Sequence, residues 1–239
     1  MFKESCKNNR EAIYGVHGFS QISDTQIKGQ LGSGFTIAPG ILVTVAHLVH
    51  LDANPKNPRV THFEVIRSPD IGQKMESASL IAEDLIHDIA LLKITSPRST
   101  KFLTLEPDKV PTGTSCGSLG FPLGELVQTP NGRSINLTER FQGSYVSSFC
   151  QAFSPSGHIV DCYEIDSLMY NGSSGCPGFL VNGHVIGMQS QSRLGQGAAK
   201  PLLNAETKTL ESPNIQLAIS MWVPSMDIIK FAKENGITL

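Results

Sequence analysis

Charged side chains are scarce in this sequence, and the few present nearly cancel. Only 17 % of the 239 residues are charged, and the formal net charge is -2. A nearly neutral chain has no strong field to attract nucleic acid or an anionic membrane surface. We therefore expect neither a nucleic-acid partner nor a membrane partner.

Long hydrophobic stretches are also missing. No apolar run approaches the roughly 20 residues that an α-helix needs to cross a bilayer. The opening segment, residues 1–10, is polar and lacks the apolar core of a secretory signal. The sequence therefore predicts no signal peptide, no membrane span and a cytoplasmic location.

Cysteine is sparse and unpaired in the sequence. The five cysteines are an odd number, and none belongs to a CxxC motif. This pattern is unlike a disulfide framework or a zinc site, so we expect reduced thiols. Five histidines also show no ligand spacing with acids or cysteines: His17, His50, His62, His158 and His184. We expect no metal and no cofactor.

Glycine and proline, by contrast, are numerous, with 22 and 14 residues. Between them recur short apolar runs in which β-branched and aromatic residues are common, as in β-strands. These runs cover residues 35–38, 41–45, 63–66, 89–94, 144–147, 178–181, 184–188 and 216–219. One segment predicts a helix, with Ser225 as its N-cap and Asn235-Gly236 at its end. The pattern indicates an all-β pair of barrels with a short C-terminal helix.

Four regions follow from this pattern. We expect an N-terminal arm (1–30), a first barrel (31–112), a second barrel (113–224) and the terminal helix (225–239). The Pro-Thr-Gly stretch at 111–113 marks the division between the barrels. Between Gln189 and Pro213 the chain turns polar and glycine-rich, which predicts a long mobile loop.

Three segments carry residues suited to nucleophilic catalysis. Ser174 lies between glycines in Asn171-Gly-Ser-Ser-Gly, His47 follows an apolar run, and Asp88 precedes another. Taken singly, they also fit an ordinary loop, a core histidine and a strand-end turn. A serine nucleophile needs a base, an acid that orients the base, and donors for the oxyanion. The order His, Asp, Ser is that of chymotrypsin-type enzymes.

The chain resembles the trypsin-like peptidase superfamily, especially its bacterial HtrA/Deg and glutamyl-endopeptidase branches. The motifs that carry the resemblance occur in order at residues 32–40, 42–47, 87–93, 117–124, 143–147, 166–177 and 181–187. The resemblance implies two six-stranded antiparallel β-barrels of the chymotrypsin type. It also implies a catalytic triad of His47, Asp88 and Ser174 in the cleft between them. The oxyanion hole then falls on the amides of Gly172 and Ser174, and Ser190 on a serine that bonds the catalytic acid.

The sequence departs from the family pattern near the nucleophile. Cys176 takes the place of the usual small residue, and we interpret it as a packed residue rather than the nucleophile. Ser173 stands where digestive enzymes carry the aspartate of their zymogen switch, so we do not expect that switch. Asp166, before the oxyanion loop, is expected to brace the loop.

The expected substrate pocket contains no charged residue. By position relative to Ser174, the resemblance places its base on Leu168, Met169 and Tyr170, with Gln189 and Ser190 on the opposite wall. No carboxylate is present to receive Arg or Lys, and the histidine of the glutamate-specific branch is absent. An unpartnered charge would be costly to bury. We therefore predict cleavage after uncharged, small to medium side chains.

The resulting hypothesis is a serine endopeptidase that hydrolyses proteins or peptides through an acyl-enzyme. Two alternatives stay open: a catalytically inactive binding module of the same fold, and an esterase or acyltransferase with the same triad. The oligomeric state, the natural substrate and the regulation are left undetermined by the sequence.

Overall fold

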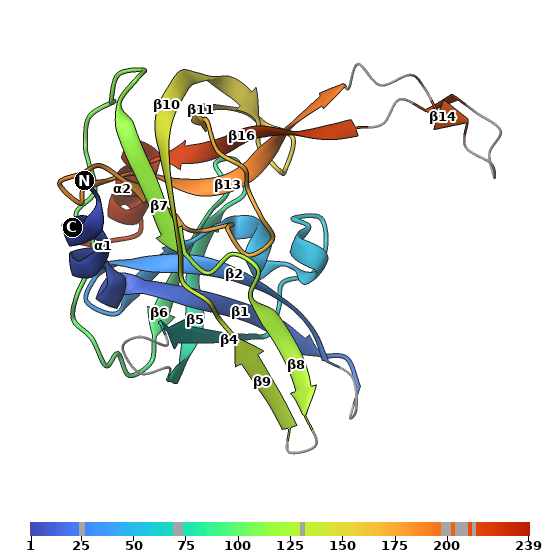
Figure 1. Ribbon diagram of the computed structural model, residues 1–239. Coiled ribbons are helices and arrows are strands. Elements are labelled where there is room, and N and C mark those ends of the chain that lie inside the picture. Colours follow the sequence, from blue (N-terminus) through green and yellow to red (C-terminus); the bar gives the residue numbers. More distant parts are fainter. Residues whose placement is uncertain (24–26, 69–73, 130–131, 197–201, 204–209, 212–213) are drawn as a thin grey trace.

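The fold is described here from a computed structural model of the chain. It describes residues 1–239 except 24–26, 69–73, 130–131, 197–201, 204–209 and 212–213. Two closed six-stranded barrels make up most of it (Figure 1). This confirms the predicted all-β, chymotrypsin-like architecture.

The first barrel has the strand order β1-β2-β3-β6-β5-β4, and every neighbouring pair is antiparallel. Its strands are β1 (Ile13–Gln21), β2 (Ile27–Ala38), β3 (Ile41–Thr44), β4 (His62–Arg67), β5 (Met75–Asp84) and β6 (Ile89–Ile94). Pairing of β1 with β4 closes it. The apolar faces bury side chains such as Tyr14, Leu42 and Leu92, which stabilises the closed sheet.

The second barrel has the order β10-β11-β16-β13-β12-β7, again antiparallel throughout. Its strands are β7 (Ser115–Gly120), β10 (Arg140–Phe153), β11 (Ile159–Ile165), β12 (Pro177–Phe179), β13 (Val185–Gln196) and β16 (Asn214–Pro224). Trp222 is buried at its centre with Tyr163 and Ile165. Two hairpins lie outside the barrels: β8 (Glu125–Thr129) with β9 (Gly132–Asn136), and β14 (Leu202–Leu203) with β15 (Leu210–Glu211).

Helices cover the barrel ends. The α-helices are α1 (Lys3–Asn9) and α2 (Ser225–Glu234), and the 3₁₀ turns are η1 (Arg10–Ala12), η2 (Ala46–Val49) and η3 (Leu51–Ala53). Ile228 and Ala232 bury the apolar side of α2 in a core cluster that includes residues of both barrels. The expected N-cap is wrong: Pro224 caps α2, and the buried Ser225 Oγ instead donates to the Glu106 carbonyl at 2.5 Å.

The N-terminal region differs from the sequence expectation. Residues 1–30 are not a separate arm, because β1 pairs with both β2 and β4 and is part of the first barrel. Glycines at 15 and 18 and the buried His17 interrupt the apolar pattern of β1, so its sequence does not read as a strand. The helix α1 was also not predicted.

The polar segment after Gln189 was interpreted as a loop. Its first part, through Gln196, continues β13 and pairs with β16, so that part of the prediction is wrong. Backbone pairing, rather than apolar side chains, extends this strand. Of the remainder, residues 197–201, 204–209 and 212–213 lie outside the described residues. Residues 95–114, which contain the predicted division at 111–113, connect β6 to β7.

The close contact between Gly178 and Trp222 generates a test of the core. A Cβ added at Gly178 would overlap the buried Trp222 ring, whereas one added at Gly143 would make ordinary contact with Phe141. Gly178→Ala should therefore lower the free energy of unfolding by about 1–3 kcal/mol through overpacking. Gly143→Ala should stay within about 0.5 kcal/mol of the wild type. Denaturant unfolding measures both, and equal stabilities would contradict the packing described here.

Candidate active site

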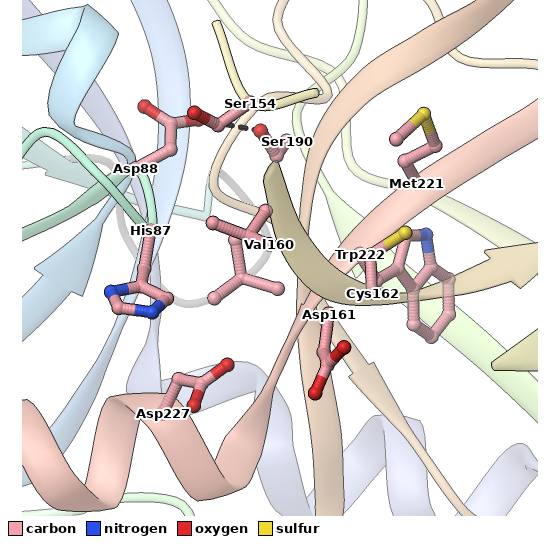
Figure 2. A pocket seen from close by; sticks show the side chains of 11 residues that line it. His87, Asp88, Ser154, Val160, Asp161, Cys162, Ser190, Met221, Trp222 and Asp227 are labelled. Atoms are coloured by element: carbon pink, nitrogen blue, oxygen red, sulfur yellow. Dashed lines mark hydrogen bonds between the residues drawn. The ribbon is translucent and has the colours of Figure 1, made fainter. Parts of the chain in front are cut away.

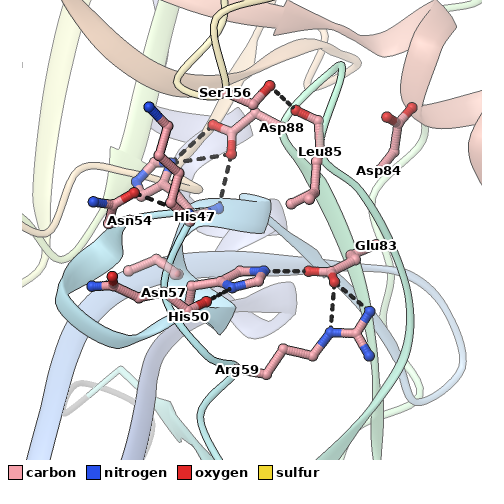
Figure 3. Close-up of polar contacts among 12 residues, drawn as sticks. His47, His50, Asn54, Asn57, Arg59, Glu83, Asp84, Leu85, Asp88 and Ser156 are labelled. Carbon is pink, nitrogen blue, oxygen red and sulfur yellow. Dashed lines mark hydrogen bonds and ion pairs between the residues drawn. The ribbon is translucent and has the colours of Figure 1, made fainter.

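Asp88 lies directly before β6 and is almost completely buried. Its carboxylate accepts hydrogen bonds from three donors: the His47 amide at 2.9 Å, His47 Nδ1 at 2.9 Å to the nearer oxygen, and Ser190 Oγ at 2.5 Å (Figures 2 and 3). Its φ of 60° is in the left-handed region, where aspartate is among the better tolerated residues. The hydrogen bonds hold the carboxylate in this backbone conformation.

His47 lies on η2, the 3₁₀ turn that follows β3. Its Nδ1 is bonded to both Asp88 oxygens, at 3.1 and 2.9 Å. A carboxylate accepts but does not donate, so this pair holds the proton on Nδ1 and leaves Nε2 as the basic nitrogen. The imidazole is thereby prepared to accept a proton at Nε2.

Ser174 lies in a tight turn between Gly172 and Gly175, both with φ of +87°. Ser33 of β2 holds this turn from the first barrel: its amide donates to the Ser174 carbonyl at 2.8 Å, and its Oγ donates to the Gly172 carbonyl at 2.9 Å. A Cβ at Gly175 would overlap the Ser33 carbonyl, so the approach requires glycine. The sequence analysis missed the role of Ser33, although it quoted the motif that contains it.

Two amides in this turn point to an anion site. Among the described residues, the N–H groups of Gly172 and Ser174 have no hydrogen-bond partner, whereas those of Ser173, Gly175 and Cys176 are all bonded. Free amides at adjacent turn positions can stabilise a developing oxyanion. The Ser174 Oγ donates only to the Ser190 carbonyl, at 3.4 Å, and within the described part of the chain it is not bonded to His47.

His47 and Ser174 line the same cleft, whose volume is about 800 Å³. Both barrels contribute to its walls. The lining residues are Gln30, Leu31, His47, Leu48, Ala53, Leu123, Met169, Tyr170, Asn171, Gly172, Ser174, Ser190, Gln191 and Ser192. This set contains no aspartate, glutamate, lysine or arginine.

The structure changes the expected substrate pocket in part. Met169, Tyr170 and Ser190 line the cleft, but Leu168 and Gln189 do not. Leu168 is exposed, and the Gln189 side chain is buried and donates to Ser118 Oγ at 3.1 Å. Gln189 lies on β13, where side chains alternate between the two faces, so a position assigned by counting can fall on the wrong face. Leu168 lies after the end of β11, outside any strand.

Gln191 and Ser192 are the cleft residues of β13 that the sequence analysis missed. The polar, glycine-rich composition after Gln189 had predicted a loop there. A prediction that β13 continues past Ser190 would have identified both residues as neighbours of the cleft.

A model of the trypsin-like peptidase domain matches residues 32–188. The chain belongs to the trypsin-like peptidase family. A probable periplasmic serine endoprotease, DegP-like, from Rickettsia conorii is 26 % identical over 180 residues, which cover 71 % of this chain and 30 % of the relative. The chain thus matches less than a third of that protein's length.

Solved structures share the fold. The active form of the Rv3671c protease from M. tuberculosis has a TM-score of 0.69 at 16 % identity, covering 98 % of this chain and 85 % of that one. The inactive form of a mutant of the same protein has a TM-score of 0.65 at 16 % identity, covering 97 % and 90 %. At this level of identity, these structures show that the fold is shared.

No helix in the described ranges is long and apolar enough to cross a membrane. The described residues also contain no cluster of histidine, cysteine and acidic side chains that could hold a metal ion. The name of the Rickettsia relative describes that protein as periplasmic. The cytoplasmic location of this chain stays a prediction.

Two other aspartates are excluded as partners of His47 by their contacts. Asp84 bonds His87 Nδ1 at 2.6 Å and the Ile86 amide at 2.8 Å. Asp166 is exposed, and its carboxylate makes no hydrogen bond within the described part of the chain. Its predicted role as a brace is therefore not supported, since it is the Asp166 carbonyl that accepts a hydrogen bond from Ser144.

A hydrogen-bonded network of His50, Glu83 and Arg59 holds the segment after His47, with the first two side chains buried and Arg59 exposed (Figure 3). His50 bonds Glu83 Oε2 through Nε2 at 2.8 Å and the Asn57 carbonyl through Nδ1 at 2.7 Å. Arg59 Nε donates to the other Glu83 oxygen at 2.6 Å. These contacts connect η2 and η3 to β5, and so anchor the turn that carries His47.

Cys176 is buried beside Gly120 and Ser33. Burial raises the pKa of its thiol to about 11, although hydrogen bonds from Ser33 and the Phe121 backbone lower it in part. A raised thiol pKa keeps the group protonated below that pH, and the protonated thiol is a poor nucleophile. Cys176 fits a packed residue.

Alkylation tests this description of Cys176. At pH 8 only about a thousandth of a thiol with its pKa is ionised, and burial restricts access further. Iodoacetamide should therefore modify the partly exposed Cys6 and Cys150 in the folded protein well before Cys176. Peptide mapping measures this, with denatured protein as the control in which all five cysteines react. Early modification of Cys176 in the folded state would contradict it.

Proposed function

We propose that this chain is a serine endopeptidase with Ser174 as nucleophile, His47 as general base and acid, and Asp88 as the group that orients His47. The observation that carries the proposal is the buried Asp88 carboxylate. It accepts from His47 Nδ1 and Ser190 Oγ at the edge of a cleft that also holds Ser174. His47 and Ser174 line the same cleft, which supports the proposal that a base of the correct tautomer serves the serine hydroxyl.

In the proposed reaction, Ser174 Oγ attacks the scissile carbonyl while His47 Nε2 takes its proton. The Gly172 and Ser174 amides bind the oxyanion, and Asp88 stabilises the imidazolium. His47 then protonates the leaving amine, which departs and leaves an acyl-enzyme. Water, deprotonated by His47, attacks the ester and releases the second product. Rotation of Ser174 Oγ away from the Ser190 carbonyl precedes attack, since apo serine hydroxyls often lack their catalytic hydrogen bond.

We infer that the residue before the scissile bond is uncharged. The absence of charged side chains among the described cleft residues supports this, because a charged side chain would lose water without gaining a partner. An apolar side chain gains about 0.8 kcal/mol for each buried CH₂. Met169 and Tyr170 supply apolar surface for it.

The two rival functions have less support. An inactive binding module has no need for the His47–Asp88–Ser190 hydrogen bonds or for two unpaired amides. An esterase or acyltransferase would use the same groups, but the relatives found are named as proteases. Comparison of a peptide substrate with its ester analogue distinguishes esterase from peptidase.

The nucleophile is tested with a fluorophosphonate probe. The wild type should be labelled, because the probe reacts with an activated serine, and Ser174→Ala should not be. Loss of a triad nucleophile lowers kcat by about 10⁶-fold. Cys176→Ala is the matched control and should keep its labelling. Labelling that persists in Ser174→Ala but disappears in Cys176→Ala would reassign the nucleophile.

The acid is tested by isosteric substitution. Asp88→Asn preserves shape but donates a hydrogen bond to Nδ1, which favours the wrong imidazole tautomer, so kcat should fall by about 10⁴-fold near neutral pH. Asp84→Asn, which removes a carboxylate bonded to His87 rather than His47, should change kcat little. Steady-state kinetics on one peptide substrate measures both, and the opposite ranking would show that another acid serves His47.

Specificity is tested by digesting proteome-derived peptide libraries. Cleavage should concentrate after Ala, Val, Leu or Gln, and Ser174→Ala provides the blank. A dominant Arg, Lys, Asp or Glu at the cleavage site would mean that the pocket is not formed by the described cleft residues.

A further inference from the structure

Cys150 and Cys162 lie directly opposite each other on neighbouring antiparallel strands, β10 and β11. Directly opposite residues have Cα atoms about 4.5–5.5 Å apart and side chains on the same face of the sheet. A disulfide needs Cα atoms about 4.4–6.8 Å apart. The backbone can therefore accept a bond between these two sulfurs without moving the strands.

The two thiols also interact in the reduced protein. Both cysteines are free, and the Cys150 thiol lies close enough to contribute to the raised pKa of Cys162. Cys150 is partly exposed, whereas Cys162 is buried. One sulfur is thus accessible to a reagent from solution, and the other lies within reach behind it.

The remaining cysteines are not placed to compete. Cys6 lies on α1, and Cys116 on β7 is opposite Ser144. Cys176 is buried behind the Ser174 turn. Of the five cysteines, all described, this pair alone is directly opposite across two strands.

Charges near the pair have opposite effects on the ionisation of the Cys162 thiol. Arg193 on β13 favours the Cys162 thiolate, while Asp161 and the Cys150 sulfur oppose it. Burial has the largest effect and raises the pKa of Cys162 to about 12. Cys162 therefore stays protonated in the resting protein, and Cys150 is the thiol that meets an external reagent first.

We propose that Cys150 and Cys162 form a redox-active dithiol that reduces a low-molecular-weight disulfide, such as oxidised glutathione, and closes to a cross-strand disulfide. This proposal does not depend on the proposed peptidase activity.

The exchange proceeds in two steps. The Cys150 thiolate, after losing its proton to solvent, attacks one sulfur of oxidised glutathione; a protein–glutathione S–S bond forms, and one glutathione thiolate leaves and is protonated. Cys162 then loses its proton and attacks the Cys150 sulfur, which expels the second glutathione. The protein loses two electrons and two protons, and one oxidised glutathione becomes two reduced ones.

The disulfide would act on a hairpin next to the cleft. Phe153 and Ile159 flank the turn between β10 and β11, are 66 % and 63 % exposed, and line a groove of about 640 Å³. Gln191 and Ser192 line both this groove and the cleft. A covalent link between the strands restricts the hairpin and hence the wall of that groove.

Cys162 also connects the pair to the Asp88 site. With Asp88, Ser190 and Trp222 it lines a small cavity of about 20 Å³ (Figure 2). Oxidation of the Cys150–Cys162 pair therefore takes place next to a cavity that the Asp88 carboxylate, which bonds His47, also lines.

The test equilibrates the full chain with defined mixtures of oxidised and reduced glutathione. The wild type should lose two hydrogens in mass, and non-reducing peptide mapping should find one cross-link, between the peptides of Cys150 and Cys162. Reduced glutathione in excess should reverse it, because a partly exposed disulfide is reducible. Persistent glutathione adducts at Cys150, a cross-link between other cysteines, or no reaction would overturn the proposal.

Two variants separate the steps. Cys162→Ala should stop at the glutathione adduct on Cys150, and Cys150→Ser should form neither adduct nor cross-link at Cys162. A variant lacking Cys6, Cys116 and Cys176 should still form the cross-link, and circular dichroism confirms that each variant is folded. Oxidation should also slow hydrogen exchange in the β10–β11 hairpin roughly tenfold or more. Exchange unchanged by the cross-link would contradict the effect on the hairpin.

Discussion

The burial of one carboxylate, Asp88, is the constraint on which the site depends. An ionised carboxylate removed from water costs on the order of several kcal/mol unless its oxygens are hydrogen-bonded. Asp88 meets this requirement with donors from two barrels: the amide and Nδ1 of His47 from the first, and Ser190 Oγ from the second. The same contacts set the imidazole tautomer, so the requirement for stability and the requirement for chemistry coincide.

A second connection between the barrels shapes the Ser174 turn. Ser33 of β2 bonds the carbonyls of Gly172 and Ser174, and the glycine at 175 permits this close approach. In the part of the chain that the structure describes, the amides of Gly172 and Ser174 have no partners. The proposed oxyanion site would therefore depend on the docking of the two barrels. Loss of barrel docking would disrupt the Asp88 contacts and the Ser174 turn together.

The outer part of the second barrel is organised differently. The β10–β11 hairpin extends beyond the buried core around Trp222 and carries exposed apolar side chains at its turn. Exposed segments open more readily than buried ones, so one added covalent link near the exposed turn would change the local stability of the hairpin. Its groove shares Gln191 and Ser192 with the cleft. The Cys150–Cys162 pair thus lies in a hairpin whose groove shares residues with the cleft wall.

Much of the fold was determined by the sequence itself. Short β-branched runs between glycines and prolines predicted eight of the twelve barrel strands, and the apolar stripe after Pro224 predicted α2, because these signals are local. The strands β1, β5, β7 and β11 were not predicted. The pairing of His47 with Asp88 was predicted from motif order, and the triad as a whole stays a prediction.

Only the tertiary structure decided what depends on register and closure. It placed β1 in the first barrel through pairing on both sides. It also extended β13 past Ser190, so that Gln191 and Ser192 line the cleft while the Gln189 side chain is buried and bonded to Ser118. It also brought Cys150 opposite Cys162. Each of these outcomes depends on which strands pair and in which register, and a shift of one residue in register reverses the face of a side chain. The composition of a local segment specifies neither its pairing partner nor the register of the pairing.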